Sequence, residues 1–204
     1  MEQIKEKCAI FGVYGKGLDA ARLTYFGLYA LQHRGQESSG ISAGNNSRIK
    51  THKATGLVVQ VYTEDDLHKL AGHMAIGHNR YSTSGGSLFQ HTQPLTDKAN
   101  LLVTAHNGNL PSLEKLKAFL LEKNIDTEGF NDTEHIHAAV TWYLQNGETL
   151  ETAITKTFPL MTGAFCLLFM TKDKIAATRD AYGIRPFSIG TINGGFVFSS
   201  ETCA

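Results

Sequence analysis

The sequence of 204 residues is long enough for one full domain or at most two small ones. Its 19 basic and 19 acidic residues balance, so no net charge attracts nucleic acid or an anionic membrane. No apolar run approaches the ~20 residues that a membrane span needs, and the polar start MEQIKEK is no signal peptide. These features predict a cytoplasmic protein with no nucleic-acid and no membrane partner.

The apolar runs are short and separated by glycines, which predicts many strands joined by tight turns. Strands are expected at residues 8–14, 39–43, 74–81 and 101–106. The last four, at 164–171, 174–179, 187–191 and 195–199, are closely spaced and predict one antiparallel meander. Helices are expected at 19–31, from about 111, from 131 to 145, and at 150–158. This order indicates an α+β protein with sheet stacked on helix layers, because strands and helices do not alternate regularly.

Three cysteines are too few and too scattered for a disulfide framework or a Cys-x-x-Cys metal site. Cys8 opens the first apolar strand behind the polar leader, and on position alone it is an ordinary buried residue. Cys166, in an apolar strand, and Cys203, near the chain end, are expected to be structural. His135 and His137 are two apart on a helix, which points their rings to different faces, so we predict no metal site.

The segment AHNGN carries two readings. Asn107-Gly108 is the commonest pair in a hairpin turn. A hairpin needs a following strand, however, and here the strand breaks at His106 ahead of Pro111 and an amphipathic helix. The Asn107 amide and the Gly108 N–H would then face open space, as the donors of an oxyanion hole do. The residues alone leave both readings open.

Two further polar segments are candidates. Arg80 ends a strand in GHNRYSTSGG, where its planar guanidinium suits a carboxylate and the glycines at 85 and 86 let a loop move. A surface arginine beside a flexible loop is the commoner alternative. In LQHRGQESSG, Arg34 and Glu37 are expected to form a local ion pair in a turn, with no reactive role.

Taken together, these segments resemble a known family. CAIFGVYG, LQHRGQESSGI, AIGHNRYSTSG, TQPL, AHNGNL, NDTE, GIRPFSIG and SSETCA follow one another in the order typical of the glutaminase domain of the amidophosphoribosyltransferases. These are class II glutamine amidotransferases of the N-terminal nucleophile hydrolase superfamily. The resemblance implies a four-layer αββα sandwich of two mainly antiparallel sheets.

The resemblance also implies roles for single residues. Residues 1–7 are a leader that is removed, after which the Cys8 thiolate attacks the glutamine amide with its freed α-amine as base. Asn107 and Gly108 match the oxyanion hole. His106 would orient that turn, or else be only a packed core histidine. Arg80 matches the residue that binds the α-carboxylate, Thr83 belongs to the same loop, and Asp132 matches the acid that binds the α-amino group.

Residues 8–204 would therefore be the glutaminase domain, releasing glutamate and ammonia from L-glutamine. In the complete enzyme the ammonia aminates phosphoribosylpyrophosphate to phosphoribosylamine, the first step of de novo purine biosynthesis. We expect these 204 residues not to include the phosphoribosyltransferase domain. The resemblance implies no cofactor for the glutaminase domain, whereas Mg²⁺, and in some relatives an iron–sulfur cluster, belong to the transferase half. It also implies a homo-oligomer.

Two alternatives stay open. One is a non-catalytic glutamine-binding or assembly module, or an unprocessed precursor. The other is an N-terminal-cysteine amidase with another substrate, against which the pairing of Arg80 with Asp132 argues.

Overall fold

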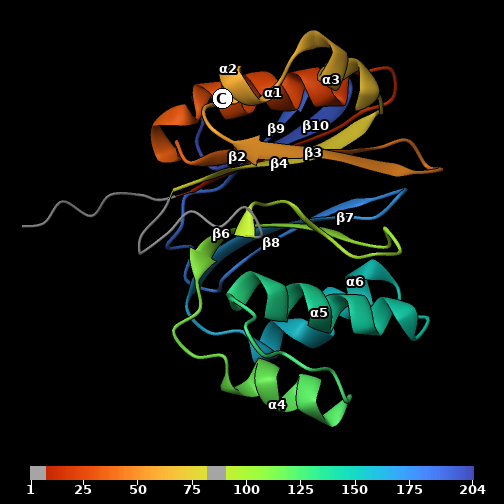
Figure 1. Ribbon diagram of the computed structural model, residues 1–204, viewed down its shortest axis with the longest axis vertical. Coiled ribbons are helices and arrows are strands. Elements are labelled where there is room, and N and C mark those ends of the chain that lie inside the picture. The colour runs from red at the N-terminus through yellow and green to blue at the C-terminus, as the bar shows by residue number, and fades with distance from the viewer. Residues whose placement is uncertain (1–7, 82–90) are drawn as a thin grey trace, which may run out of the picture.

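The computed structural model describes residues 8–81 and 91–204, and within them two antiparallel sheets lie face to face (Figure 1). Sheet A has the order β3-β2-β4-β1-β10-β9 and sheet B the order β5-β6-β7-β8. The strands of sheet A are β1 (Ala9–Tyr14), β2 (Ser38–Gly44), β3 (Ile49–Thr55), β4 (Met74–Arg80), β9 (Ser188–Ile192) and β10 (Gly195–Ser199). Those of sheet B are β5 (Leu95–Thr96), β6 (Val103–Asn109), β7 (Ala164–Met170) and β8 (Ile175–Arg179).

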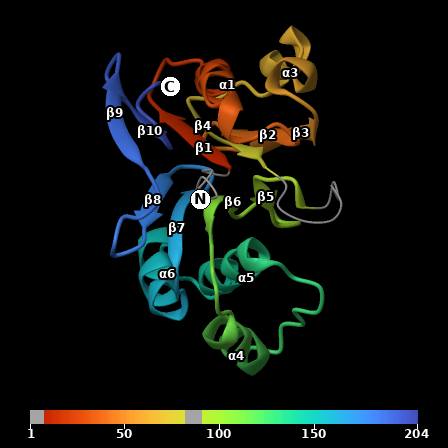
Figure 2. The same ribbon diagram turned by 90° about the vertical axis from the view of Figure 1, so that its left-hand side faces the viewer.

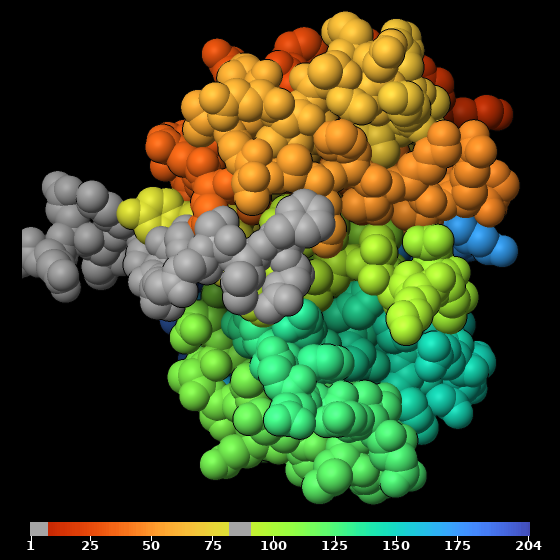
Figure 3. All heavy atoms as spheres, in the orientation of Figure 1, coloured from red at the N-terminus to blue at the C-terminus, as the bar shows by residue number. Residues whose placement is uncertain are grey.

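Helices cover the outer face of each sheet, as the two perpendicular views show (Figures 1 and 2). Sheet A carries α1 (Ala20–Ala30), α2 (Val58–Val61) and α3 (Glu64–Lys69), and sheet B carries α4 (Glu114–Glu122), α5 (Asp132–Gln145) and α6 (Leu150–Thr157). Short 3₁₀ helices follow α1 and α6, as η1 (Gln32–Arg34) and η3 (Phe158–Leu160). In the space-filling view, the N-terminal residues, coloured red to yellow, gather at the top, and the residues of α4 to α6, coloured green to cyan, gather at the bottom (Figure 3). The predicted four-layer αββα sandwich is confirmed.

Alternation along β1 explains how the layers hold together. Ala9, Phe11 and Val13 belong to the apolar cluster under α1, whereas Ile10 belongs to the cluster between the sheets. A third cluster fills the space between sheet B and its helices. Because successive strand residues face opposite sides, each inner strand supplies two of the three cores.

Small residues bring α1 close to sheet A. A Cβ at Gly27 would lie 2.5 Å from the Phe11 ring, and one at Gly77 would lie 2.7 Å from Thr24. Both positions therefore require glycine for steric reasons. This close packing fixes β1 and β4, the two strands that lead into the candidate site.

The predicted strands and helices are found within a few residues of their expected bounds, but the predicted C-terminal meander is wrong. β7 and β8 pair in sheet B, whereas β9 and β10 pair in sheet A. The residues between β8 and β9, 180–187, are enough to cross from one sheet to the other. The sequence pattern specified the two hairpins but not this crossing. It also missed β3, β5, α2 and α3.

Candidate active site

The candidate residues meet at one end of the sandwich. Cys8 immediately precedes β1, and Arg80 ends β4; these strands run antiparallel, with Ala9 opposite Asn79. The same end of sheet B is attached through a hydrogen bond across the sheets, 3.1 Å long, between His78 Nε2 and the His106 carbonyl oxygen. The expected nucleophile, Cys8, and the expected oxyanion segment at Asn107 are therefore contributed by different sheets.

Arg34 holds the backbone of Cys8 from both sides. The Cys8 N–H donates to the Arg34 carbonyl at 3.0 Å, and Arg34 Nε donates to the Cys8 carbonyl at 2.9 Å. Cys8 has a φ of +66°, in the left-handed region that side-chain-bearing residues seldom adopt. Its Sγ lies 4.0 Å from the Tyr81 carbonyl oxygen, beside Arg80. The surroundings therefore impose a specific orientation on this thiol.

The expected local ion pair between Arg34 and Glu37 is wrong. Arg34 is 1% exposed, and its Nη1 pairs with Glu201 Oε1 at 2.5 Å. The Glu37 carboxylate instead lies 3.7 Å from Arg80 Nε. Glu201 follows β10, which pairs with β1, so the charged partner comes from the other end of the chain. The local sequence around Arg34 cannot indicate Glu201 as its partner, because the two residues are far apart in the sequence.

Burial keeps the Cys8 thiol protonated near neutral pH. Burial raises the pKa of Cys8, and the nearby charges of Arg80, Arg185 and Arg34 offset only part of that effect. A thiol in this state needs a base before it can act as a nucleophile.

The strand carrying Asn107 and Gly108 does not break at His106, as the sequence had suggested. β6 continues to Asn109, with Asn107 opposite Cys166 and Gly108 opposite Phe165, because β7 offers a partner along its whole length. The hairpin-turn reading of Asn107-Gly108 is therefore also wrong. Both residues lie in the last stretch of a strand.

Backbone geometry nevertheless leaves a donor at Gly108. In an antiparallel strand, N–H groups alternate between the two edges. The His106 N–H donates to Gln93 Oε1 at 2.7 Å, and the Leu110 N–H donates to Asp132 Oδ2 at 3.4 Å. Alternation puts the Gly108 N–H on the same edge, between the N–H groups of His106 and Leu110. Within residues 8–81 and 91–204, no side chain accepts a hydrogen bond from it.

The amide of Asn107 is tied to the strand behind Cys8. Asn107 is fully buried, and its Nδ2 donates to Ser200 Oγ at 3.5 Å. Ser200 Oγ in turn accepts the Ile10 N–H at 2.9 Å. Ser200, which carries no chemical motif in the sequence, thus connects the amide to the residue two positions after Cys8.

The two oppositely charged candidates come from different elements: Arg80 ends β4, and Asp132 begins α5. Arg80 Nη1 donates to the His91 carbonyl at 3.0 Å. Asp132 is the first residue of α5, and its Oδ1 accepts the Thr133 N–H at 2.8 Å. Its side chain remains 24% exposed. Thr83 lies outside the described residues.

His106 is neutral and acts through hydrogen bonds. Burial lowers its pKa, and the Asp132 carboxylate opposes that shift only in part. His106 Nδ1 lies 3.0 Å from Thr133 Oγ1. The ring therefore connects β6 to the first turn of α5.

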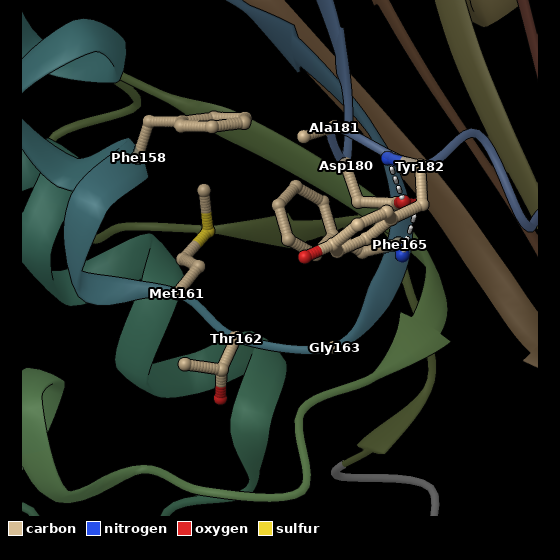
Figure 4. A pocket seen from close by; sticks show the side chains of 8 residues that line it. All are labelled: Phe158, Met161, Thr162, Gly163, Phe165, Asp180, Ala181 and Tyr182. Carbon is tan, nitrogen blue, oxygen red and sulfur yellow. Dashed lines mark hydrogen bonds between the residues drawn. The ribbon is translucent and has the colours of Figure 1, made fainter.

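A cavity of about 330 Å³ lies elsewhere, on the side of β7 towards η3 (Figure 4). It is lined mainly by apolar side chains, including Phe158, Met161 and Phe165. Its carboxylate, Asp180, already accepts the N–H groups of Phe165, Tyr182 and Gly183. With its acid used to hold a turn, this cavity offers no catalytic group.

Within the described residues, no cluster of three or more histidine, cysteine or acidic side chains is placed to hold a metal ion. His135 and His137 bond to different partners, the Asn131 carbonyl and Thr104 Oγ1. No helix in this part of the chain is long and apolar enough to cross a membrane.

Comparison with known proteins identifies the family. The family described as "Glutamine amidotransferase domain" matches residues 78–204. The chain belongs to this glutamine amidotransferase family. The amidophosphoribosyltransferase of Mycobacterium tuberculosis is 41% identical over 98% of the chain, and that of Bacillus subtilis is 37% identical over 98%. The chain spans 39% and 42% of the lengths of these two relatives.

Solved structures agree with this assignment. Glutamine phosphoribosylpyrophosphate amidotransferase from B. subtilis, in complex with ADP and GMP, is 36% identical, with a TM-score of 0.84 over 96% of the chain and 42% of its own. A structure described as the allosteric regulatory enzyme of purine biosynthesis is 37% identical, with a TM-score of 0.85 and the same coverage. These likenesses confirm the family resemblance and the fold predicted from the sequence.

Proposed function

We propose that residues 8–204 form the glutaminase domain of an amidophosphoribosyltransferase and hydrolyse the side-chain amide of L-glutamine at Cys8. The observation that carries this proposal is the shared strand edge. There, the Gly108 N–H lies between two N–H groups that already have acceptors, and the second acceptor is Asp132. A free α-amino acid carries a carboxylate for Arg80 and an ammonium for Asp132, which leaves its neutral amide for Cys8.

In the proposed reaction, Cys8 Sγ forms a bond to the amide carbon while the carbonyl electron pair moves onto oxygen. The Asn107 amide and the Gly108 N–H donate to that oxyanion. Collapse of this intermediate breaks the C–N bond, and ammonia leaves once its nitrogen has taken a proton. Water then attacks the thioester, releasing glutamate and restoring the thiol.

The base in this scheme is the α-amine of Cys8, which exists only after residues 1–7 are removed. An α-amine titrates near ~8 and can take the thiol proton and pass it to the departing nitrogen, whereas a peptide nitrogen cannot. The Cys8 nitrogen donates to the Arg34 carbonyl at 3.0 Å. The same contact would hold the freed amine beside its own thiol.

The activity of a whole enzyme belongs to the same proposal. The relatives' names support transfer of the ammonia to phosphoribosylpyrophosphate by a phosphoribosyltransferase domain, in purine biosynthesis. A homo-oligomeric assembly, a cytoplasmic location, and Mg²⁺ or an iron–sulfur cluster in the transferase half stay predictions. The glutaminase step, as proposed, uses only groups of this chain.

The test is glutamate release by the purified chain, with its intact mass measured first. We expect activity when the mass shows loss of residues 1–7, and none above background in Cys8→Ala or Cys8→Ser. Cys203→Ala is the matched control, because Cys203 is an exposed cysteine at the other end of the chain. Full activity in the Cys8 variants would refute the assignment.

An unprocessed precursor is the second candidate, favoured by the presence of residues 1–7 ahead of Cys8, which make its nitrogen part of a peptide bond. Such a chain would bind glutamine without turning it over. Stabilisation by glutamine without glutamate release, in protein of full mass, would identify it.

A further inference from the structure

We propose that Gln93 is a positioning residue that sets the spacing between the oxyanion donor at Gly108 and the carboxylate of Asp132. This inference rests on the proposed function. It assigns to Gln93 the selection of substrates that carry an α-amino group, and the contacts of this one buried side chain support it.

Gln93 takes the place of a strand partner. Leu95 of β5 pairs with Thr104 of β6, so the same register brings Gln93 opposite His106. β5 has ended at this point, and the buried His106 N–H would lack an acceptor without the side chain of Gln93. Gln93 Oε1 accepts it at 2.7 Å.

The other end of the same amide reaches α5. Gln93 Nε2 donates to Thr133 Oγ1 at 3.2 Å, and Thr133 directly follows Asp132. One side chain, 7% exposed, therefore spans from the oxyanion strand to the first turn of the helix that presents the acid.

The hydrogen bonds of Thr133 close this network. A hydroxyl has one donor and two acceptor positions. Thr133 Oγ1 accepts from Gln93 Nε2, lies 3.0 Å from His106 Nδ1 and lies 3.3 Å from Asp132 Oδ1. All three positions are filled if neutral His106 donates from Nδ1 and Thr133 donates to Asp132. Removing Gln93 would therefore take away one hydrogen bond from the strand and one from the residue next to the acid.

Sheet A fixes the backbone of Gln93. Lys53 Nζ donates to the carbonyls on either side, Thr92 at 2.6 Å and Pro94 at 3.2 Å. A Cβ at Gly40 would lie 2.2 Å from the Gln93 carbonyl oxygen, so glycine there permits the close approach. The Gln93 side chain thus extends from an anchored backbone.

The consequence concerns substrates held at two points. Glutamine would bind Gly108 through its amide oxygen and Asp132 through its amino group. If the distance between these two groups varies, glutamine can no longer contact both at once in the reactive geometry. 4-Carbamoylbutanoate, which is glutamine without the amino group, makes no use of Asp132. Loss of Gln93 should therefore lower the rate with glutamine more than the rate with this analogue.

The test compares kcat/KM for the two substrates in the chain with a free Cys8 amine. We expect Gln93→Ala to lower the preference for glutamine by about tenfold, as the loss of one or two buried hydrogen bonds allows. Thr133→Val should shift the preference in the same direction.

The matched control is Thr104→Val. Thr104 Oγ1 lies 2.9 Å from His137 Nδ1, so this bond also joins β6 to α5 but touches neither Gly108 nor Asp132. We expect it to lower the melting temperature and to leave the preference unchanged.

If Gln93→Ala does not fold, the same ratio of kcat/KM values is measured in Gln93→Glu. A protonated glutamic acid can accept from His106 and donate to Thr133 as the amide does, whereas a carboxylate cannot donate. The preference for glutamine should therefore recover as the pH is lowered. The ratio of the two substrates cancels the pH dependence of the steps that they share. The parent chain, measured at the same pH values, shows the part that comes from titration of Asp132, which only glutamine uses.

An unchanged preference in Gln93→Ala, or an equal loss in Thr104→Val, would overturn this inference and leave the proposed function standing. A pH-independent preference in Gln93→Glu would do the same. If the parent chain with a free Cys8 amine neither binds nor hydrolyses glutamine, the proposed function fails and the inference with it.

Discussion

The two sheets hold their halves of the candidate site by different forces. On the sheet A side, Cys8 is held by the buried Arg34, which is paired with Glu201. On the sheet B side, neutral groups fix the oxyanion strand through hydrogen bonds, mainly Gln93, His106 and Thr133. Burial, opposed in part by the surrounding charges, sets the protonation of the Cys8 thiol, whereas the side-chain contacts of Gln93 involve only uncharged groups. Each prediction below tests one side of this difference.

The largest effect is expected from the neutral side. Asn107→Ala removes an oxyanion donor and should lower kcat for glutamine by ~100- to 1000-fold, with KM little changed. Asn109→Ala is the control, because Asn109 lies on the same strand with its side chain exposed. Steady-state kinetics of glutamate release measure both. A kcat within tenfold of the parent would remove Asn107 from the proposed oxyanion hole.

The next effect belongs to the charged side. Arg80→Lys keeps the charge but loses the planar fork that matches a carboxylate, so KM for glutamine should rise by ~10- to 100-fold with a smaller change in kcat. Arg22→Lys is the control, since Arg22 pairs with Glu64 at the surface. If kcat falls instead while KM is unchanged, Arg80 acts on the thiol rather than on the substrate.

Stability in acid tests the contact between the sheets. Burial lowers the pKa of His78 from 6.5 to about 3, so the folded protein keeps it neutral while the unfolded chain takes up a proton. Stability from this group is therefore complete above pH ~6.5 and is lost as the pH falls towards 3, at ~1.4 kcal/mol per pH unit.

Urea unfolding at pH 7 and pH 5 measures this loss. The parent should lose about 2 kcal/mol more than His78→Gln, whose amide can still donate to the His106 carbonyl. Other buried histidines contribute equally to both proteins. The same pH dependence in the two would show that His78 is not held neutral.

Much of this fold could be predicted because it is encoded locally. Alternation along β1 and β4 and the cap at Asn131 sit in contiguous segments, and the structure has them near the expected bounds. The crossing at 180–187 was not predictable in this way, because turn chemistry specifies hairpins and not the sheet they join.

The residues of the candidate site also differ in whether local sequence could indicate them. The sequence and the family resemblance indicated Cys8, Arg80 and Asp132, which the structure brings to one end of the sandwich. They gave no role to Gln93, Ser200 or Glu201, although all three lie in segments that carry the resemblance, since each contacts a residue that is distant in the sequence. Gln93 replaces a backbone acceptor, and Ser200 bonds to Ile10 across 190 positions. Such contacts leave no periodic signal.

The smallest expected effect tests whether charge holds the sheet A side of the site. The pKa of Glu201 is lowered: burial opposes the shift, but the hydrogen bonds from Arg34 and His33 outweigh it. A lowered carboxyl pKa contributes stability that is present above pH ~4.5 and is lost as the pH falls further. Glu201→Gln should cost about 1 kcal/mol at pH 7, and its stability should approach that of the parent in acid.

Ser200→Ala is the matched neutral change, one residue away. It removes the acceptor of the Ile10 N–H and should cost about 1 kcal/mol at every pH, because no group involved titrates. Urea unfolding of both variants between pH 7 and pH 3.5 makes the comparison. Converging curves for Glu201→Gln beside parallel curves for Ser200→Ala would establish that charge holds the nucleophile's side. Parallel curves for both would mean that Arg34 is held by hydrogen-bond geometry alone, and that the two sheets do not differ in this respect.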